Sequence, residues 1–308
     1  MALPKITMVG AGNVGATAAQ MILQKGLADV VMIDVAEGLA RGKALDMMQM
    51  RSNECFAPHI TATGDYADTA GSDLVVVTAG VPRKPGMTRE DLLAVNSGIV
   101  RAVLDGALAA SPNAIFLFVT NPLDVMVNLA FDLAGLPRER LFGMGGVLDT
   151  ARFIHAISEA LAVEPADIDA LVIGAHGEAM LPLPRLARVQ GRPLSEWLTE
   201  QQIADVVKAT VEGGARVVEY LQTGSAYYAP ASSIVCMVSE ILAPTGKLLS
   251  VCARLEGEYG ISGVHLGVPA RLGRRGVEKI VELPLEEAEL AALSQAAEAT
   301  KAQLKQLG

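Results

Sequence analysis

The stretch ITMVGAGNVG at residues 6–15 joins a short apolar run to three glycines with the spacing G-x-G-x-x-G. An apolar run, such a glycine loop and a following run of helix-forming residues predict a strand, a tight turn and a helix. Gly10 allows the tight turn, Gly12 lets a pyrophosphate approach the backbone, and Gly15 allows the helix to pack closely on the strand. The helix N-terminus would face the phosphate charge. We therefore predict a dinucleotide-binding βαβ unit at the start of the chain.

Asp34 follows the next apolar run, Val30–Ile33, and indicates which dinucleotide is bound. A carboxylate at the end of this second strand accepts hydrogen bonds from the ribose hydroxyls of NAD and repels the 2′-phosphate of NADP. The alternative is a glycine turn near an unrelated surface aspartate. Because strand, loop, helix and acid occur in register, the sequence favours NAD as the cofactor.

Short apolar runs alternate with longer helical patterns through the first half of the chain, which indicates an α/β domain with a parallel sheet. The candidate strands there are residues 6–9, 29–33, 60–63, 74–78, 115–120 and 141–143. Later segments are expected as a helix over 151–162, a strand near 168–174, a helical stretch over 200–242 broken around 223–230, strands over 248–255 and 264–268, and a helix over 285–307. The predicted fold is a Rossmann doubly wound parallel sheet in an NAD-binding domain (1–145), followed by an α+β catalytic and substrate domain (146–308).

Composition and charge argue against several classes of protein. The net charge of −9 over 308 residues disfavours nucleic-acid binding. No apolar run reaches the roughly 18 residues of a membrane helix, and a strand that begins near Ile6 leaves no room for a signal sequence, so we expect a cytoplasmic protein. Cys55, Cys236 and Cys252 form no C-x-x-C pair, so we expect buried reduced thiols and no metal site.

The loop VPRKPGMTR at residues 81–89 follows the fourth candidate strand, at the ligand end of the expected sheet. Its prolines and glycine predict a loop that could close as a lid. Arg83 and Arg89 could both meet one anionic substrate, because a guanidinium group matches a carboxylate with two hydrogen bonds. A solvated basic loop is an equally good interpretation of this segment alone.

Two more polar groups follow later strands. Asp149 and Arg152 lie three residues apart at a helix start, which by itself is typical of a local ion pair. His176 lies between two glycines in Gly174-Ala175-His176-Gly177, which leaves room for a ligand beside its ring. The other three histidines, at positions 59, 155 and 265, have the contexts of surface or core residues.

Together these motifs resemble the lactate/malate dehydrogenase family, and in particular its lactate-dehydrogenase-like malate dehydrogenase branch. The resemblance runs essentially end to end. The motifs that carry it are GAGNVG at 10–15, VPRKPGMTR at 81–89, VTNP at 119–122, LDTAR at 148–152, GAHGE at 174–178 and TGSA at 223–226.

The resemblance implies a role for each matching residue. His176 would be the acid/base, and Asp149 would hold its imidazole in one tautomer. Arg152 would bind the C1 carboxylate of the substrate, Arg89 would polarise the reacting carbonyl, and Asn121 would donate a hydrogen bond to the substrate. The implied cofactor-binding residues are Gly10, Ala11, Gly12, Asn13, Val14, Gly15, Asp34, Asn96, Val119, Thr120 and Asn121.

Arg83 favours a dicarboxylic acid as the substrate. A second carboxylate buried without a partner would cost several kcal/mol, and an arginine would pair with it. The resemblance then implies reversible hydride transfer between (S)-malate and NAD⁺, giving oxaloacetate and NADH, as in the tricarboxylic acid cycle. It also suggests a homotetramer, with a dimer as the alternative. Open alternatives are a lactate or other 2-hydroxyacid dehydrogenase, a noncatalytic NAD-binding protein, and an NAD-dependent glycosidase, although no Cys/His metal site is apparent.

Overall fold

The computed structural model describes residues 3–82 and 87–307, and its first half is a parallel sheet. Arg83 lies outside the described residues. The sheet has the strand order β3-β2-β1-β4-β5-β6, which is that of a doubly wound Rossmann fold. Its strands are β1 (Lys5–Val9), β2 (Asp29–Ile33), β3 (Ile60–Thr63), β4 (Leu74–Val77), β5 (Ile115–Phe118) and β6 (Leu141–Gly143).

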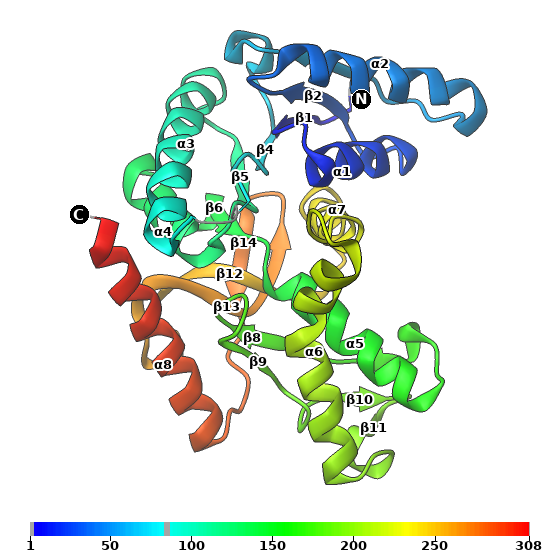
Figure 1. The fold of residues 1–308 in the computed structure, drawn as a ribbon, viewed down its shortest axis with the longest axis vertical. Coiled ribbons are helices and arrows are strands. Elements are labelled where there is room, and N and C mark those ends of the chain that lie inside the picture. Colours follow the sequence, from blue (N-terminus) through cyan, green and yellow to red (C-terminus); the bar gives the residue numbers. More distant parts are fainter. Residues whose placement is uncertain (1–2, 83–86, 308) are drawn as a thin grey trace.

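Helices cover both faces of this sheet (Figure 1), and strand β4, with the sequence LVVV, shows why. Leu74 and Val76 belong to the core cluster that includes residues of the helices α1 and α7, whereas Val75 and Val77 belong to the cluster formed with α3 and α4. A strand buried on both sides needs apolar residues at every position. The helices of this half are α1 (Asn13–Gln24), α2 (Glu37–Glu54), α3 (Arg89–Ala110) and α4 (Leu123–Ala134).

The second half continues the same sheet with antiparallel strands, because β12 pairs with β6 at Cys252 and Gly143. The added strands are β12 (Leu248–Glu256), β13 (Ser262–Gly273), β14 (Gly276–Ile280), β8 (Val172–Gly174) and β9 (Met180–Pro182), and a separate small sheet contains β7 (Ile168–Asp169), β10 (Arg188–Val189) and β11 (Arg192–Pro193). The helices are α5 (Gly146–Leu161), α6 (Glu200–Leu221), α7 (Tyr228–Leu242) and α8 (Glu287–Leu304). Figure 1 shows α5 and α6 side by side, with α8 along the other side of this half.

The α/β fold class is confirmed, and several element bounds differ from expectation. Helix α5 begins at Gly146, five residues before the expected start, and the strand expected near 168–174 is two strands. Strands β9, β10, β11 and β14 were not predicted, since each is short or polar. Cys55 is exposed, so the expectation of three buried thiols is wrong there.

Among the described residues, one helical segment, Glu90–Ala110, is long and apolar enough to meet the length and hydropathy of a membrane span. It belongs to α3, whose Val100, Leu104 and Ala107 are buried in the core cluster beside β5. Core helices of globular proteins meet the same criterion, so this segment alone is weak support for a span.

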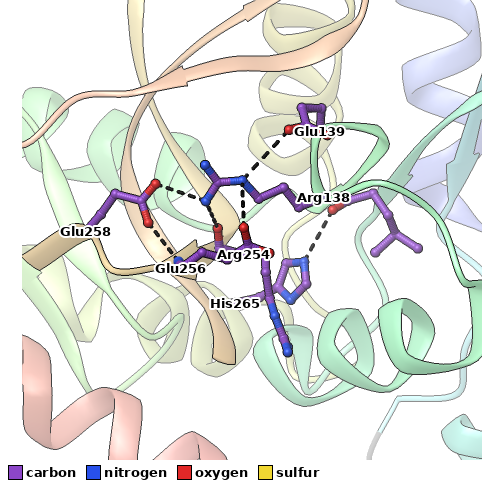
Figure 2. A network of polar contacts seen from close by, with 7 residues as sticks. Arg138, Glu139, Arg254, Glu256, Glu258 and His265 are labelled. Atoms are coloured by element: carbon purple, nitrogen blue, oxygen red, sulfur yellow. Dashed lines mark hydrogen bonds and ion pairs between the residues drawn. The ribbon is translucent and has the colours of Figure 1, made fainter. Parts of the chain in front are cut away.

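A polar network fastens the β12–β13 hairpin to the first half (Figure 2). Nη1 of Arg138 donates to the Arg254 carbonyl oxygen at 3.2 Å and to Oε1 of Glu258 at 2.9 Å. Nε2 of the fully buried His265 lies 3.3 Å from the carbonyl oxygen of Leu141. Burial and the nearby Arg254 charge lower the pKa of His265 to about 3. His265 is therefore a neutral core histidine with hydrogen-bond partners.

Candidate active site

The glycine loop forms an open cradle at the N-terminus of α1. Gly10 has φ +105°, and a Cβ there would lie 2.8 Å from Oγ1 of Thr78. A Cβ on Gly15 would collide with the carbonyl oxygen of Gly10, so close helix-to-strand packing requires glycine. Nothing lies within 4 Å of the Cβ position of Gly12, the residue that caps α1. This space and the exposed helix N-terminus fit a pyrophosphate.

Asp34 joins the glycine loop to the turn after β2. Its Oδ2 accepts the Ala11 N–H at 2.6 Å, and its Oδ1 accepts the Ala36 N–H at 2.8 Å. Lys43, on α2, donates from Nζ to the Ala11 carbonyl oxygen at 2.8 Å, which ties the loop to a second element.

Asp34 also faces a cavity of about 420 Å³ beside the loop. Its lining has four carboxylates and one arginine among Asp34, Val35, Glu37, Arg41, Thr63, Gly64, Asp65 and Asp68. This excess of negative charge is compatible with ribose hydroxyls and unfavourable for a 2′-phosphate, so the site fits NAD better than NADP.

Asn96 and Thr120 hold the loops at the ends of β4 and β5 together. Oδ1 of Asn96 accepts the Val81 N–H at 2.9 Å, and its Nδ2 donates to the Asn121 carbonyl oxygen at 2.7 Å. Oγ1 of Thr120 donates to the Ala79 carbonyl oxygen at 2.6 Å. Asn96 and Thr120 are buried, so both side chains shape the loops, while Asn121 is exposed at the edge of the sheet.

Three of the predicted site residues meet at the start of α5. Nδ1 of His176 lies 2.8 Å from Oδ2 of Asp149, and Nη1 of Arg152 donates to Oδ1 of the same carboxylate at 3.1 Å. The Asp149 side chain is only 2% exposed, whereas the His176 and Arg152 side chains are each 19% exposed. The acid is thus buried behind an imidazole and a guanidinium group that both reach solvent.

The surroundings of His176 set its proton affinity. Burial alone lowers the pKa of an imidazole, but the Asp149 charge, its hydrogen bond and the Asp124 charge outweigh burial and the opposing Arg152 charge. The pKa of His176 is therefore raised. A histidine with a raised pKa and a hydrogen-bonded carboxylate suits reversible proton transfer near neutral pH.

Asp124 was not predicted as a site residue, yet its Oδ2 accepts the backbone N–H of His176 at 2.8 Å. The residue is 6% exposed and lies in the first turn of α4, where an aspartate is usually a solvated helix-end charge. No local pattern indicates that a loop 52 residues later folds onto it.

Gly213 and Gly214 were not predicted as site residues either, and they lie inside α6 against Arg152. A Cβ on Gly214 would lie 3.2 Å from Nη2 of Arg152, and one on Gly213 would lie 3.5 Å from its Cδ. Two glycines within a helix are unfavourable by roughly 0.5–1 kcal/mol each. Consecutive glycines in a helical pattern were the available signal, since they often mark close packing.

The remaining predicted substrate ligands lie in the 81–89 loop. Arg83 is outside the described residues, and Arg89 is the first residue of α3, preceded by a Thr88 cap that accepts the Asp91 N–H at 3.0 Å. The cap fixes where the helix begins after the loop. Among the described residues, no group of three His, Cys, Asp or Glu side chains is arranged to hold a metal ion.

Comparison with known families identifies both halves of the chain. The model of the lactate/malate dehydrogenase NAD binding domain matches residues 4–143, and that of the lactate/malate dehydrogenase alpha/beta C-terminal domain matches residues 146–307. The chain belongs to the lactate/malate dehydrogenase family. The family resemblance and the NAD-binding domain predicted from the sequence are thereby confirmed.

Individual members of the lactate/malate dehydrogenase family are similar over nearly their full length. A malate dehydrogenase from Nostoc punctiforme is 50% identical over 299 residues, covering 97% of this chain and 91% of the relative. The crystal structure of Cryptosporidium parvum malate dehydrogenase has a TM-score of 0.95 at 39% identity and covers 99% of each chain. The lactate dehydrogenase of Cryptosporidium parvum, complexed with lactic acid and nicotinamide adenine dinucleotide, has a TM-score of 0.95 at 36% identity, covering 99% of this chain and 98% of that one.

The backbone does not separate the two kinds of dehydrogenase, because both Cryptosporidium structures match this chain with a TM-score of 0.95. The choice between a monocarboxylate and a dicarboxylate must depend on side chains near the substrate. The roles of individual site residues and the predicted domain boundary at residue 145 remain predictions.

Proposed function

We propose that this protein is an NAD-dependent malate dehydrogenase that interconverts (S)-malate and oxaloacetate. The observation that carries the proposal is the contact of His176 and Arg152 with one buried carboxylate, that of Asp149. This arrangement offers a proton carrier next to a carboxylate-binding group. The relatives named malate dehydrogenase support the choice of acid.

In malate oxidation, neutral His176 accepts the substrate hydroxyl proton at Nε2. The ionised Asp149 accepts the Nδ1–H, which keeps the lone pair on Nε2, and it stabilises the imidazolium that forms. In oxaloacetate reduction the same proton returns to the substrate oxygen. Bound NAD⁺ would supply the hydride acceptor for the substrate C2.

Arg152 orients the substrate. Its Nη1 is engaged by Asp149, and its other guanidinium donors bind the C1 carboxylate. Arg89 polarises the reacting carbonyl, and Asn121 donates a hydrogen bond to the substrate. Arg83 pairs with the second carboxylate, which lactate and pyruvate lack.

The cofactor is held by the glycine loop and the strand ends. The backbone of residues 10–15 would cradle the pyrophosphate, and the Asp34 carboxylate would accept hydrogen bonds from the adenosine ribose. The segment of Val119, Thr120 and Asn121, held in place by Asn96, would also contact the cofactor.

The test is NADH consumption by the purified protein with oxaloacetate and pyruvate side by side, and with NADPH as the cofactor control. We expect much faster turnover of oxaloacetate than of pyruvate, and of NADH than of NADPH. Faster turnover of pyruvate would instead support the lactate dehydrogenase alternative, for which the similar Cryptosporidium parvum lactate dehydrogenase is the motivation. No turnover of either acid would support a noncatalytic NAD-binding protein.

The assignment of Arg83 has its own test. Replacing Arg83 with glutamine removes the charge for the second carboxylate, so kcat/KM for oxaloacetate should fall by about 10²-fold or more while that for pyruvate changes little. Lys84→Gln in the same loop is the matched control and should keep the preference. An unchanged ratio of oxaloacetate to pyruvate activity in Arg83→Gln would exclude this role.

We also propose a cytoplasmic homo-oligomer, a homotetramer with a dimer as the alternative, in keeping with the family resemblance. Light scattering of the purified protein measures the mass directly against the 32.2 kDa chain. A monomer would overturn this proposal.

A further inference from the structure

A second buried carboxylate, that of Asp124, contacts His176 at its backbone N–H. It lies on α4 in the first half of the molecule, whereas Asp149 lies on α5 in the second. Its Oδ2 accepts the His176 backbone N–H at 2.8 Å. Thus one carboxylate holds the imidazole and the other holds the main chain of the same residue.

The segment around His176 needs such a contact because its backbone is permissive. Gly174 and Gly177 flank it with φ values of +87° and +104°, conformations that glycine adopts without strain. Gly145 allows the histidine to lie close to α4, since a Cβ there would be 3.1 Å from the His176 Cβ and 2.6 Å from Cδ2 of Leu123. The hydrogen bond from the His176 N–H to Asp124 on helix α4 fixes the backbone conformation that Gly174 and Gly177 would otherwise leave variable.

The other oxygen of Asp124 has a partner on β12. Sγ of Cys252 lies 3.4 Å from Oδ1 and acts as the donor. Burial and the neighbouring Asp124 charge raise the pKa of this thiol, so it keeps its proton and remains a donor. Cys252 is 1% exposed and pairs with Gly143 at the junction of the two halves. The thiol is thus well placed to support an ionised Asp124.

We propose that Asp124, supported by the Cys252 thiol, is a positioning residue that fixes the main chain of His176 and supplies a second negative charge near its imidazole. This inference rests on the proposed acid/base role of His176. It assigns a function to a buried carboxylate and to a cysteine otherwise explained only as core packing.

The ionisation of Asp124 connects this geometry to pH. Burial raises the pKa of Asp124 to about 6, against the lowering effects of the His176 charge, the His176 N–H and the Cys252 thiol, with the Asp149 charge raising it slightly further. Above about pH 6 the carboxylate is charged and raises the pKa of His176. Below that pH it is protonated, the support for the imidazolium weakens, and turnover should decline.

The first test is Asp124→Asn, measured as the pH profile of oxaloacetate reduction. We expect kcat/KM to fall about 10- to 100-fold, because a neutral amide holds the His176 N–H more weakly than a carboxylate does and carries no charge to support the imidazolium. Oxaloacetate reduction needs protonated His176, so loss of the Asp124 charge should also move the alkaline decline to lower pH. Affinity for NADH should stay unchanged. Asp132→Asn, an exposed aspartate on the same helix, is the matched control and should behave as wild type.

The second test separates the thiol from the fold. Cys252→Ala removes the donor, raises the pKa of Asp124 and should move the acidic decline of activity to higher pH, whereas Cys252→Ser keeps a donor and should restore the wild-type profile. If Asp124→Asn loses activity without a shift of either limb, or if serine and alanine behave alike, the proposal is wrong.

A third measurement distinguishes this proposal from the proposed function itself. The pKa of His176, measured by NMR in the NADH complex, should fall in Asp124→Asn whether or not oxaloacetate is a substrate. An unchanged His176 pKa would overturn the positioning role even in an active malate dehydrogenase. A lowered pKa in a protein that does not turn over oxaloacetate would sustain the positioning role and reject only the activity.

Discussion

The two buried histidine regions of this protein have opposite electrostatics. At His176, the Asp149 carboxylate contacts the ring, the Asp124 carboxylate accepts the backbone N–H, and the pKa of the imidazole is raised. Around His265, the charged neighbour is Arg254, and the pKa falls to about 3. Burial opposes the charged form in both places, so the neighbours decide whether a histidine carries a proton.

The hydrogen-bond partners of the two histidines also differ. His176 has a carboxylate at Nδ1, whereas the ring nitrogens of His265 lie 3.2 Å from the Asn128 amide oxygen and 3.3 Å from the Leu141 carbonyl oxygen, and the neutral ring donates its one N–H to one of these two acceptors. The ring of Phe131 also contacts His265 edge-on, with the centroids 5.0 Å apart. A neutral, fully enclosed histidine stabilises the junction, while a partly exposed histidine with a raised pKa can exchange a proton with a substrate.

The largest expected effect comes from removing the proton carrier. His176→Asn should lower kcat for oxaloacetate reduction by about 10⁴-fold, because no other described group near Asp149 can donate the proton. NADH affinity, measured by fluorescence titration, should remain close to wild type. A variant with near-normal kcat would refute the acid/base assignment.

A smaller loss should follow from removing the charge behind the ring. Asp149→Asn keeps the shape of the side chain but no longer enforces the Nδ1–H tautomer or stabilises the imidazolium, so kcat should fall by about 10²- to 10³-fold. The alkaline decline of oxaloacetate reduction should move to lower pH, since the pKa of His176 loses its main support. If the pH profile stays in place, neighbouring charge is not what distinguishes the two histidines.

His265 should instead control stability in acid. Its pKa is about 3 in the folded protein and about 6.5 when unfolded, so between these values the unfolded chain binds more protons and stability falls as pH falls. His265→Gln should remove about 1.4 kcal/mol per pH unit from that slope between pH 6 and 4. Urea unfolding at several pH values measures the slope, and an unchanged slope would contradict the assignment.

The smallest effect concerns the ion pairs beside His265. Arg138→Met removes the donors to Glu258 and to the Arg254 carbonyl, and we expect the free energy of unfolding to fall by about 1 kcal/mol, because the Arg138 side chain is partly solvated. Arg192→Met, which breaks an exposed pair with Glu196, is the matched control and should cost less. Equal losses in urea unfolding would show that the network in Figure 2 is no stronger than a surface pair.

The parallel half of the fold could be predicted from the sequence because most of its strands are apolar runs that alternate with helical patterns. The strands 29–33, 60–63 and 141–143 have the expected bounds. In the second half, β10 and β11 are two-residue strands with the sequences RV and RP, which carry no periodicity. Helix α5 starts early because Gly145 and Gly146 pack against His176 and Ser250, a tertiary reason absent from the local pattern.

The site residues that belong to sequence motifs could be predicted from the sequence. His176, Asp149 and Arg152 were predicted and lie together. Asp124 was not predicted, since its proposed role in positioning His176 depends on a contact between segments 52 residues apart in sequence. The role of Cys252 was not predicted for the same reason. Its thiol donates to the Asp124 carboxylate only because strand pairing brings the two side chains together.

The paired glycines of α6 limit how this protein could be made more thermostable. Alanine at Gly213 or Gly214 is a substitution that a designer would try first, since each promises a gain of roughly 0.5–1 kcal/mol in helix stability. At Gly214 the new methyl group would lie 3.2 Å from Nη2 of Arg152, so the guanidinium group that is proposed to bind substrate would have to shift slightly. A substitution that stabilises helix α6 at Gly214 would therefore weaken the binding of the substrate carboxylate by Arg152.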